Sequence, residues 1–334
     1  MEAERFSAKP GGTPFPDLLE KLCWKGKGLV RPECVLTTAS GDIFSADWRG
    51  GVAHIRPDGS QALYAGTLPG GRPLRPNGIA LRRNGNFLLA DLGEEVGGVF
   101  ELTREGAVHP VLVEVEGVEI PPSNFVFEDP AGRLWLTVST RHRPRARAYR
   151  KDIADGFIVL MDERGARIAA DGLGYTNEAA ISPGGRFLYV NETFARKLTR
   201  FRIGADGSLA GRETVASFGR GTFPDGLAFD AEGGIWITSI VSNRVIRVLP
   251  DGAQQTVLED ADEGHIAWVE EAFQNDAMGR PHLDRCAGKV LKNISSLAFG
   301  GADRRTAFLG CLLGDSLACF QTPVSGHSPG HWNY

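Results

Sequence analysis

Short apolar stretches alternate with glycine-containing turns along most of this 334-residue chain. Six segments share one pattern, a strand, a turn that contains glycine, and a second strand rich in Phe, Leu, Trp or Ile. They begin at Pro32, Pro76, Ser123, Thr176, Pro224 and Ser295. In several of them a third strand ends in Asp-Gly or a similar turn dipeptide, and a fourth short strand leads to the next unit. The pattern therefore predicts a repeat of four short antiparallel strands.

The spacing of these segments indicates one architectural unit. Their starts lie 44 to 53 residues apart, except that the last interval is 71 residues long. Six units of four short strands at this period predict an all-β, six-bladed β-propeller, with one insertion near residues 258–291. A β-sandwich or two stacked barrels would also contain short strands and turns, but neither repeats one motif in phase. Because no linker or change in composition divides the chain, we expect a single domain over residues 1–334.

Helices are expected only outside the repeated strands. The insertion contains the stretch HIAWVEEAFQNDA, from His265 to Ala277, which predicts one helix. The segment from Pro16 to Leu22 predicts a second, short one. Neither changes the all-β class.

The first strand of each propeller blade lines the central channel, so the residues at the six strand starts converge on one axis. In this chain they are Glu33, Asn77, Asn124, Asn177, Asp225 and either Ser295 or Ser296. Carboxylates and carboxamides are costly to bury without partners, and calcium, magnesium and manganese take such oxygen ligands. Asn and Asp also form turns at strand starts, but Glu33 is a poor turn former. The phased set therefore predicts a divalent-cation site in the channel.

Composition and charge narrow the class of protein. Hydrophobic residues make up 42% and charged residues 23% of the chain, as in ordinary globular proteins. The net charge of −4 gives no reason to expect a nucleic-acid partner or a membrane surface. No stretch approaches the roughly 20 apolar residues of a membrane span, and residues 1–14 lack the apolar core of a signal peptide. Nothing in the pattern fixes an oligomeric state.

The cysteines favour a reduced compartment. The chain contains Cys23, Cys34, Cys286, Cys311 and Cys319, an odd number without CxxC spacing. This usage argues against both a disulfide framework and a thiolate zinc site. We therefore expect a cytoplasmic enzyme or binding protein.

The blade motifs resemble the senescence marker protein (regucalcin)/gluconolactonase family, six-bladed propellers that include sugar lactonases and a diisopropyl-fluorophosphatase. The resemblance runs from about Leu29 to Phe320. It rests on Glu33 in the first blade, Asn124 before FVFEDPAGRLW, Asn177 before SPGGRFLYV, and Asp225 within PDG before LAFDAEGGIW. The resemblance implies that these four residues hold a divalent cation, most often calcium, with zinc or magnesium also accepted. It also implies a catalytic role for Asp225.

The chain departs from the family pattern beside these residues. The family usually places a substrate-binding Arg before the third-blade Asn and Asp after it, whereas Ser123 and Phe125 flank Asn124 here. The fourth-blade Asn is usually followed by Gly, and here by Glu178. The usual Glu-Gly-Pro of the first blade is Glu-Cys-Val. The cation site therefore carries over better than the sugar pocket.

Two unusual segments are predicted to lie in loops on the same face as the cation site. Residues 139–152 carry six cations within eleven residues, and the insertion near residues 258–291 carries His265. A charge run of this kind is usually a solvated face, but it can also cover the channel and bind a substrate carboxylate. The predicted substrate-binding residues are Trp48, Asn77, Arg141, His142, Glu178 and His265. The expected partner is therefore a small molecule, with a carboxylate-bearing substrate as one interpretation.

These observations favour a gluconolactonase-like, metal-dependent hydrolase that opens a lactone or related ester. The cation would polarise the carbonyl oxygen as a Lewis acid, and Asp225 would act as general base or as nucleophile. The chain lacks G-x-S-x-G, HExxH and a GxGxxG after a strand, so no other nucleophile or cofactor motif competes. Two alternatives stay open, namely a metal-assisted isomerase, dehydratase or lyase at the same site, and a non-catalytic propeller that binds a ligand or protein.

Overall fold

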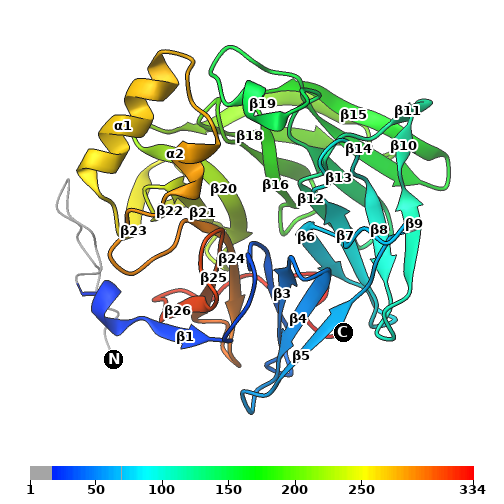
Figure 1. The fold of residues 1–334 in the computed structure, drawn as a ribbon, viewed down its shortest axis with the longest axis horizontal. Helices are drawn as coiled ribbons and strands as arrows, with labels where there is room; N and C mark the ends of the chain where they lie inside the picture. The colour runs from blue at the N-terminus through cyan, green and yellow to red at the C-terminus, as the bar shows by residue number, and fades with distance from the viewer. Residues whose placement is uncertain (1–16, 69) are drawn as a thin grey trace.

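The computed structural model describes residues 17–68 and 70–334, which form a ring of six four-stranded antiparallel sheets (Figure 1). Blades 1 and 2 consist of β2 (Val35–Thr37), β3 (Ile43–Asp47), β4 (Gly51–Ile55) and β5 (Gln61–Ala65), then β6 (Pro76–Leu81), β7 (Phe87–Asp91), β8 (Val99–Leu102) and β9 (Val108–Leu112). Blades 3 and 4 consist of β12 (Phe125–Glu128), β13 (Leu134–Val138), β14 (Gly156–Asp162) and β15 (Gly165–Leu173), then β16 (Thr176–Ile181), β17 (Phe187–Glu192), β18 (Lys197–Ile203) and β19 (Leu209–Ser217). Blade 5 consists of β20 (Thr222–Phe229), β21 (Ile235–Val241), β22 (Arg244–Val248) and β23 (Gln254–Glu259).

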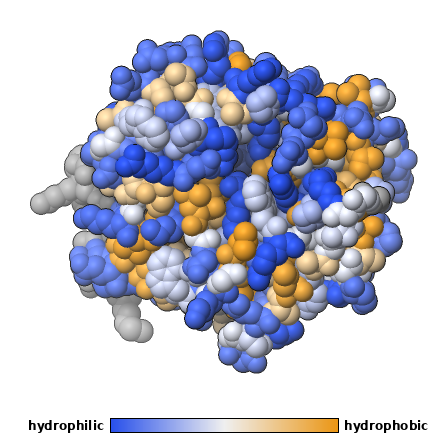
Figure 2. Space-filling view, viewed as in Figure 1, coloured by the Kyte–Doolittle hydropathy of each residue, from blue (hydrophilic) through white to orange (hydrophobic). Residues whose placement is uncertain are grey.

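The first strands of the blades surround the channel. β2 contacts β6, and contacts continue in order through β12, β16 and β20 to β24 (Ile294–Gly300), which returns to β2. The predicted all-β, six-bladed propeller is therefore confirmed. A short ribbon of β10 (Glu114–Val115) and β11 (Val118–Glu119) connects blades 2 and 3. Hydrophilic residues dominate the face shown in Figure 2, and apolar side chains occupy separate small areas of it.

Blade 6 closes the ring with strands from both ends of the described chain. β24, β25 (Thr306–Cys311) and β26 (Leu317–Gln321) supply three strands, and β1 (Cys23–Lys25) pairs with β26 as the fourth. This pairing places Cys23 opposite Cys319 with the Cα atoms 5.0 Å apart, and the two sulfurs form a disulfide. The expectation that the chain has no disulfide is therefore wrong, because strand pairing, and not cysteine spacing, brings these thiols together.

The disulfide also removes the support that cysteine usage gave to a cytoplasmic location. The other support, the lack of an apolar core in residues 1–14, falls in a segment outside the described residues. Across the described part of the chain, no helix combines the length and the apolar character needed to cross a membrane.

The insertion before blade 6 contains two helices that both contact β21 (Figure 1). α1 (Glu263–Gln274) begins after Asp262, whose carboxylate accepts a hydrogen bond from the His265 amide at 2.7 Å. Because Asp262 caps the helix, α1 begins two residues before the predicted start at His265, and it ends three residues before Ala277. α2 (Arg280–Asp284) follows.

Two further segments form only single turns of 3-10 helix. One is η1 (Leu19–Lys21), which lies within the predicted helix of residues 16–22. The other is η2 (Arg145–Ala148), in the arginine-rich loop of residues 139–152. Residue 16 lies outside the described residues.

Blades 3 and 5 repeat the same buried carboxylate–indole pair. In blade 5, Asp230 accepts hydrogen bonds from Trp236 Nε1 at 2.8 Å and from Arg247 Nε at 2.7 Å. In blade 3, Asp129 accepts a hydrogen bond from Trp135 Nε1 at 2.9 Å. Both indoles are fully buried, so each needs an acceptor inside the protein. The recurring motif therefore joins the turn between the first two strands of a blade to the core.

We expect Asp230→Ala to lower the free energy of unfolding by roughly 3–5 kcal/mol, because it leaves Arg247 and Trp236 without their buried acceptor. Burial alone would raise the pKa of Asp230, but hydrogen bonds from Arg247, Trp236 and Gly234 outweigh burial, and its pKa lies below the usual value. The stabilisation is therefore complete above the unfolded-state pKa of about 3.9 and is lost as the pH falls through the folded-state pKa. Urea unfolding at neutral and acid pH measures both effects, with the exposed turn variant Asp251→Ala as control. A stability difference that stays constant at acid pH would contradict this assignment.

Candidate functional site

The strand starts around the channel are shaped by β-bulges. In four of the first strands, two consecutive residues oppose one residue of the neighbouring strand. The bulged pairs are Asn77–Gly78, Asn177–Glu178, Asp225–Gly226 and Ser295–Ser296. A bulge redirects side chains away from simple alternation. The predicted strand-start residues of these four blades are therefore held out of the regular ladder, whereas Glu33 and Asn124 precede β2 and β12.

Gly226 shows why the second position of a bulge is restricted. A Cβ atom at Gly226 would lie 2.5 Å from the carbonyl oxygen of Ser295 and 2.6 Å from the Cα of Ser296, in the next blade. A side chain would therefore force the two blades apart beside Asp225. This close approach gives a physical reason for the glycine in the PDG motif.

One residue lies at the start of each blade's first strand around the channel, and we call these six residues the strand-start ring: Glu33, Asn77, Asn124, Asn177, Asp225 and Ser295. All six are buried. Hydrogen bonds join neighbouring blades at the ring. Ser295 Oγ donates to the Glu33 carbonyl at 2.9 Å, and Asn77 Nδ2 donates to the Asn124 carbonyl at 3.1 Å. The structure thus places the predicted cation ligands among the buried residues at the strand starts, and their coordination of a cation stays a prediction.

The ring presents oxygen atoms that lack partners. Glu33 Oε2, Asn77 Oδ1 and Asn124 Oδ1 are buried without a hydrogen-bond partner among the described residues. Asn177 donates through Nδ2 to Thr193 Oγ1 at 3.1 Å, so its amide nitrogen is already engaged. Buried acceptors are normally satisfied, and a divalent cation with oxygen ligands would satisfy these.

The same residues define what kind of metal site this could be. Within residues 17–68 and 70–334, no three His, Cys, Asp or Glu side chains are grouped so that they could hold a metal ion. A cation at the ring would therefore depend on the carboxylates of Glu33 and Asp225 and on asparagine amide oxygens. This donor set suits a hard cation such as calcium better than zinc.

Arg31 brings a positive charge to the ring and was not predicted from the sequence. Its Nη2 lies 2.7 Å from Glu33 Oε2. The contact lacks hydrogen-bond geometry, since neither that oxygen nor Arg31 Nε has a hydrogen-bond partner among the described residues. The guanidinium lies 4.5 Å from the centre of the Trp48 ring, and Trp48 Nε1 donates to the Pro76 carbonyl at 3.0 Å. Trp48, a predicted pocket residue, thus holds Arg31 beside the ring.

Arg145, one of the arginines of the 139–152 loop, is a second cation near the ring. Its Nη2 donates to Ser139 Oγ at 3.1 Å, and Ser139 Oγ donates to the carbonyl of Thr176, the residue before Asn177. Its guanidinium lies 5.4 Å from the centre of the Tyr175 ring. Arg145 Nε is buried and has no hydrogen-bond partner within the described chain. The arginine run therefore contributes one side chain to the inner wall.

The pKa of Asp225 reflects its burial and the charged side chains around it. Burial raises the pKa of its carboxyl well above the usual value, and the nearby carboxyls of Glu33 and Glu178 raise it further. Arg31 and Arg145 act in the opposite direction. The two arginines do not offset burial and carboxylate repulsion, so the protein alone does not compensate the negative charge at the ring.

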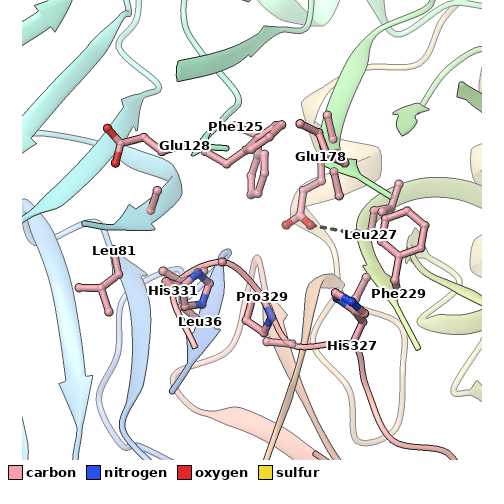
Figure 3. Close-up of a pocket in the computed structure, with 18 of the residues that line it drawn as sticks. Leu36, Leu81, Phe125, Glu128, Glu178, Leu227, Phe229, His327, Pro329 and His331 are labelled. Atoms are coloured by element: carbon pink, nitrogen blue, oxygen red, sulfur yellow. Dashed lines mark hydrogen bonds between the residues drawn. The ribbon is translucent and has the colours of Figure 1, made fainter. Parts of the chain in front are cut away.

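Glu178 lies on the other side of the ring from these arginines. It lines a channel cavity of about 360 Å³ that none of the strand-start ring residues lines, and its Oε2 accepts a hydrogen bond from the Leu227 amide at 2.9 Å (Figure 3). Burial raises its pKa to about 8, with Glu33 adding to the shift. The predicted substrate-binding role of Glu178 would therefore apply to this cavity and not to the loop side of the channel.

The C-terminal segment forms one wall of that cavity, which the sequence did not indicate. His327, Pro329 and His331 line it opposite the strands (Figure 3). The segment is held at both ends, since the His327 amide donates to the Phe229 carbonyl at 2.8 Å and the Trp332 carbonyl accepts from the Ala39 amide at 2.7 Å. Access to the ring from this side is therefore restricted.

Other predicted pocket residues lie away from the ring. Arg141 donates twice to the carboxylate of Asp171 at 2.8 Å, and His142 lies 3.9 Å from the Asp155 carboxylate on the outer part of the same loop. His265 is buried on α1 with its ring 5.6 Å from that of Trp268. No contact found among the described residues connects these side chains to the ring. Their roles in substrate binding stay predictions.

The arginine-rich loop and the insertion pack on one aromatic cluster. It consists of Tyr149, Tyr175, Phe194, Phe223 and Phe273. A half-buried ion pair, with 2.7 Å between Arg196 Nη2 and Glu270 Oε1, ties the turn between β17 and β18 to α1 beside these rings. The cluster therefore fixes the backbone that carries Arg145.

Comparisons with known proteins agree with this architecture. The model of the SMP-30/gluconolactonase/LRE-like region matches residues 75–262. A 6-deoxy-6-sulfogluconolactonase from Pseudomonas putida is 31% identical over 178 residues, which are 52% of this chain and 57% of the relative. The chain therefore matches little more than half the length of that relative.

Two solved structures show the same fold. A gluconolactonase from Xanthomonas campestris superposes with a TM-score of 0.66 at 20% identity, covering 90% of this chain and 89% of that one. Regucalcin from Agrobacterium tumefaciens, a calcium-binding protein, superposes with a TM-score of 0.64 at 17% identity, covering 93% and 98%. At these identities the likeness concerns the fold.

Proposed function

Because the chain belongs to the SMP-30/gluconolactonase/LRE-like family, we propose that it is a metal-dependent hydrolase that opens a small-molecule lactone. The observation that carries this proposal is the strand-start ring, where the buried amide oxygens of Asn77 and Asn124 have no hydrogen-bond partner among the described residues. A purely structural ring of turn formers would satisfy these acceptors internally. The named lactonase relative and the fold of the solved structures are consistent with it.

Glu33, Asn124, Asn177 and Asp225 would hold the cation, which we propose to be calcium because the donors are all oxygens. When bound, a divalent cation polarises a carbonyl oxygen and makes an attacking water more acidic. The two carboxylates supply its charge balance, and the amide oxygens complete the ligand set. Trp48 and Arg31 would line the side of the channel from which substrate approaches.

Asp225 is the ring residue suited to move a proton. Glu33 is engaged by Arg31 at 2.7 Å, and the other ring side chains are amides or a hydroxyl. We propose that Asp225 accepts the proton of the attacking water as general base, with nucleophilic attack by the same carboxylate as the second route. Asn191 Nδ2 fixes its backbone by donating to the Asp225 carbonyl at 3.0 Å.

A lactone panel with and without chelator tests this function. We expect turnover with calcium, loss of turnover in chelator, recovery on adding calcium back, and a product heavier than the substrate by one water. Mass spectrometry of each product, corrected for spontaneous hydrolysis, is the measurement. Turnover that survives chelation would contradict the metal requirement, and a product of unchanged mass would indicate an isomerase. Absence of turnover across the panel, together with calcium-dependent ligand binding, would favour the non-catalytic alternative.

A further inference from the structure

Two guanidinium groups approach the strand-start ring from separate parts of the chain. Arg31 precedes β2 and lies 2.7 Å from Glu33, and Arg145 lies in η2 and bonds Ser139 next to blade 4. Both act electrostatically on Asp225. Tertiary structure thus places two fixed positive charges on the loop side of one small site.

Both groups have unused hydrogen-bonding capacity. The Nε atoms of Arg31 and Arg145 are buried, and within the described residues neither has an acceptor. A buried N–H of a charged group without an acceptor costs free energy of folding. In a binding site, such a group is suited to donate a hydrogen bond to an oxygen of the ligand. The aromatic rings of Trp48 and Tyr175 lie against the two guanidinium groups and limit their movement.

The charge balance of the site points in the same direction. A divalent cation held by Glu33 and Asp225 would use both negative charges of the ring. Arg31 and Arg145 would then have no counter-charge at the ring. A buried site with two uncompensated guanidinium groups favours a ligand that brings negative charge.

Three other arginines of the 139–152 loop do not compete for this role. Arg141 is paired with Asp171, and Arg150 is paired with Asp152 at 2.8 Å on the surface. Arg147 is exposed. Only Arg145 combines a buried, unpartnered Nε with proximity to the ring among the described side chains of this loop.

We infer that Arg31 and Arg145 form an anion subsite, and that the substrates are lactones bearing an oxoanion such as carboxylate, sulfonate or phosphate. This inference rests on the proposed lactonase function. The subsite would bind the anionic group and orient the ring carbonyl towards Asp225. Arg31 and Arg145 are therefore specificity-determining residues.

Matched substrates test the subsite. Glucono-1,4-lactone and glucaro-1,4-lactone differ only by a hydroxymethyl against a carboxylate, and 6-sulfonate and 6-phosphate analogues complete the set. We expect the calcium-loaded enzyme to prefer at least one anionic lactone by about 10-fold or more in kcat/KM. Arg145→Gln should lower kcat/KM for that anionic lactone by about 10-fold, mainly through KM, and should lower it less for the neutral lactone, so that the preference is lost. Arg31→Gln should act in the same direction, and Arg147→Gln, an exposed position in the same loop, is the matched control.

The outcomes separate this inference from the proposed function. Hydrolysis of the neutral lactone with no preference for any anionic analogue would overturn the subsite and leave the lactonase intact. An equal loss on neutral and anionic lactones in Arg145→Gln would also overturn it. If no lactone reacts, calorimetric titration of the calcium-loaded protein with glucarate decides the subsite alone. Binding that Arg145→Gln weakens by about 10-fold supports it, and binding unchanged by Arg145→Gln rejects it.

Discussion

Asp225→Asn should reduce lactone turnover by about 10²-fold or more even when the cation site is saturated, the scale expected when a general base is removed. Asparagine keeps the shape of the side chain and one oxygen ligand but cannot accept a proton from water. Excess calcium would restore occupancy of the ring without restoring the base. The measurement is kcat at saturating calcium, with calcium content determined by calorimetry.

Two comparisons make this result decisive. Asp251→Asn, in an exposed turn of the same blade, should leave turnover unchanged. If metal-saturated Asp225→Asn retains near-wild-type kcat, Asp225 is only a ligand and another base must exist. The structure then favours Glu178 over Glu192, because the carboxylate of Glu192 already accepts hydrogen bonds from Gly174, Thr199 and Arg212.

Glu33→Gln is expected to weaken calcium affinity by about 10-fold or more, since it removes one of only two carboxylates at the ring. The rise in melting temperature that calcium produces should shrink in parallel, because a ligand stabilises only as far as it binds the folded state. Calcium titration calorimetry and thermal unfolding with calcium and with chelator measure the two effects.

The exposed turn variant Glu105→Gln is the control for Glu33→Gln. Arg31→Gln tests how the positive charge of Arg31 affects calcium binding, separately from the ligand role of Glu33. Arg31 Nη2 lies 2.7 Å from Glu33 Oε2. Arg31→Gln should strengthen calcium binding if Arg31 only opposes the cation. Unchanged calcium affinity in Glu33→Gln would show that the ring consists of turn-forming residues.

The strand-start ring was predictable because its members share a phase. Each of Glu33, Asn124, Asn177 and Asp225 occupies the same place in its own blade, so one repeat period aligns them all. The period arises from local properties, alternation of apolar residues and glycine turns, that a sequence displays directly. The same period does not show whether these residues coordinate a cation, which Glu33→Gln and Asp225→Asn test.

Glu178 shows where strand periodicity alone is insufficient. It follows Asn177 directly, and the sequence predicted it for the substrate pocket. The bulge in β16 holds both residues out of the ladder and places Glu178 in the cavity walled by the C-terminal segment. The direction of a side chain at a bulge depends on the backbone and on the neighbouring strand, which the sequence pattern does not specify.

The sequence by itself determined the class of fold, the number of blades, the insertion and the residues of the ring, because these depend on short-range patterns repeated in phase. Tertiary structure alone decided the Cys23–Cys319 disulfide and the approach of Arg31 and Arg145 to one site. The two members of each pair are separated by more than 100 residues of sequence, and only the folded ring brings the two cysteines into contact and both arginines near Asp225. Arg145 also resembles every other arginine of its loop in sequence. Burial beside Ser139 and Tyr175 distinguishes it, because contact and desolvation are properties of the folded chain.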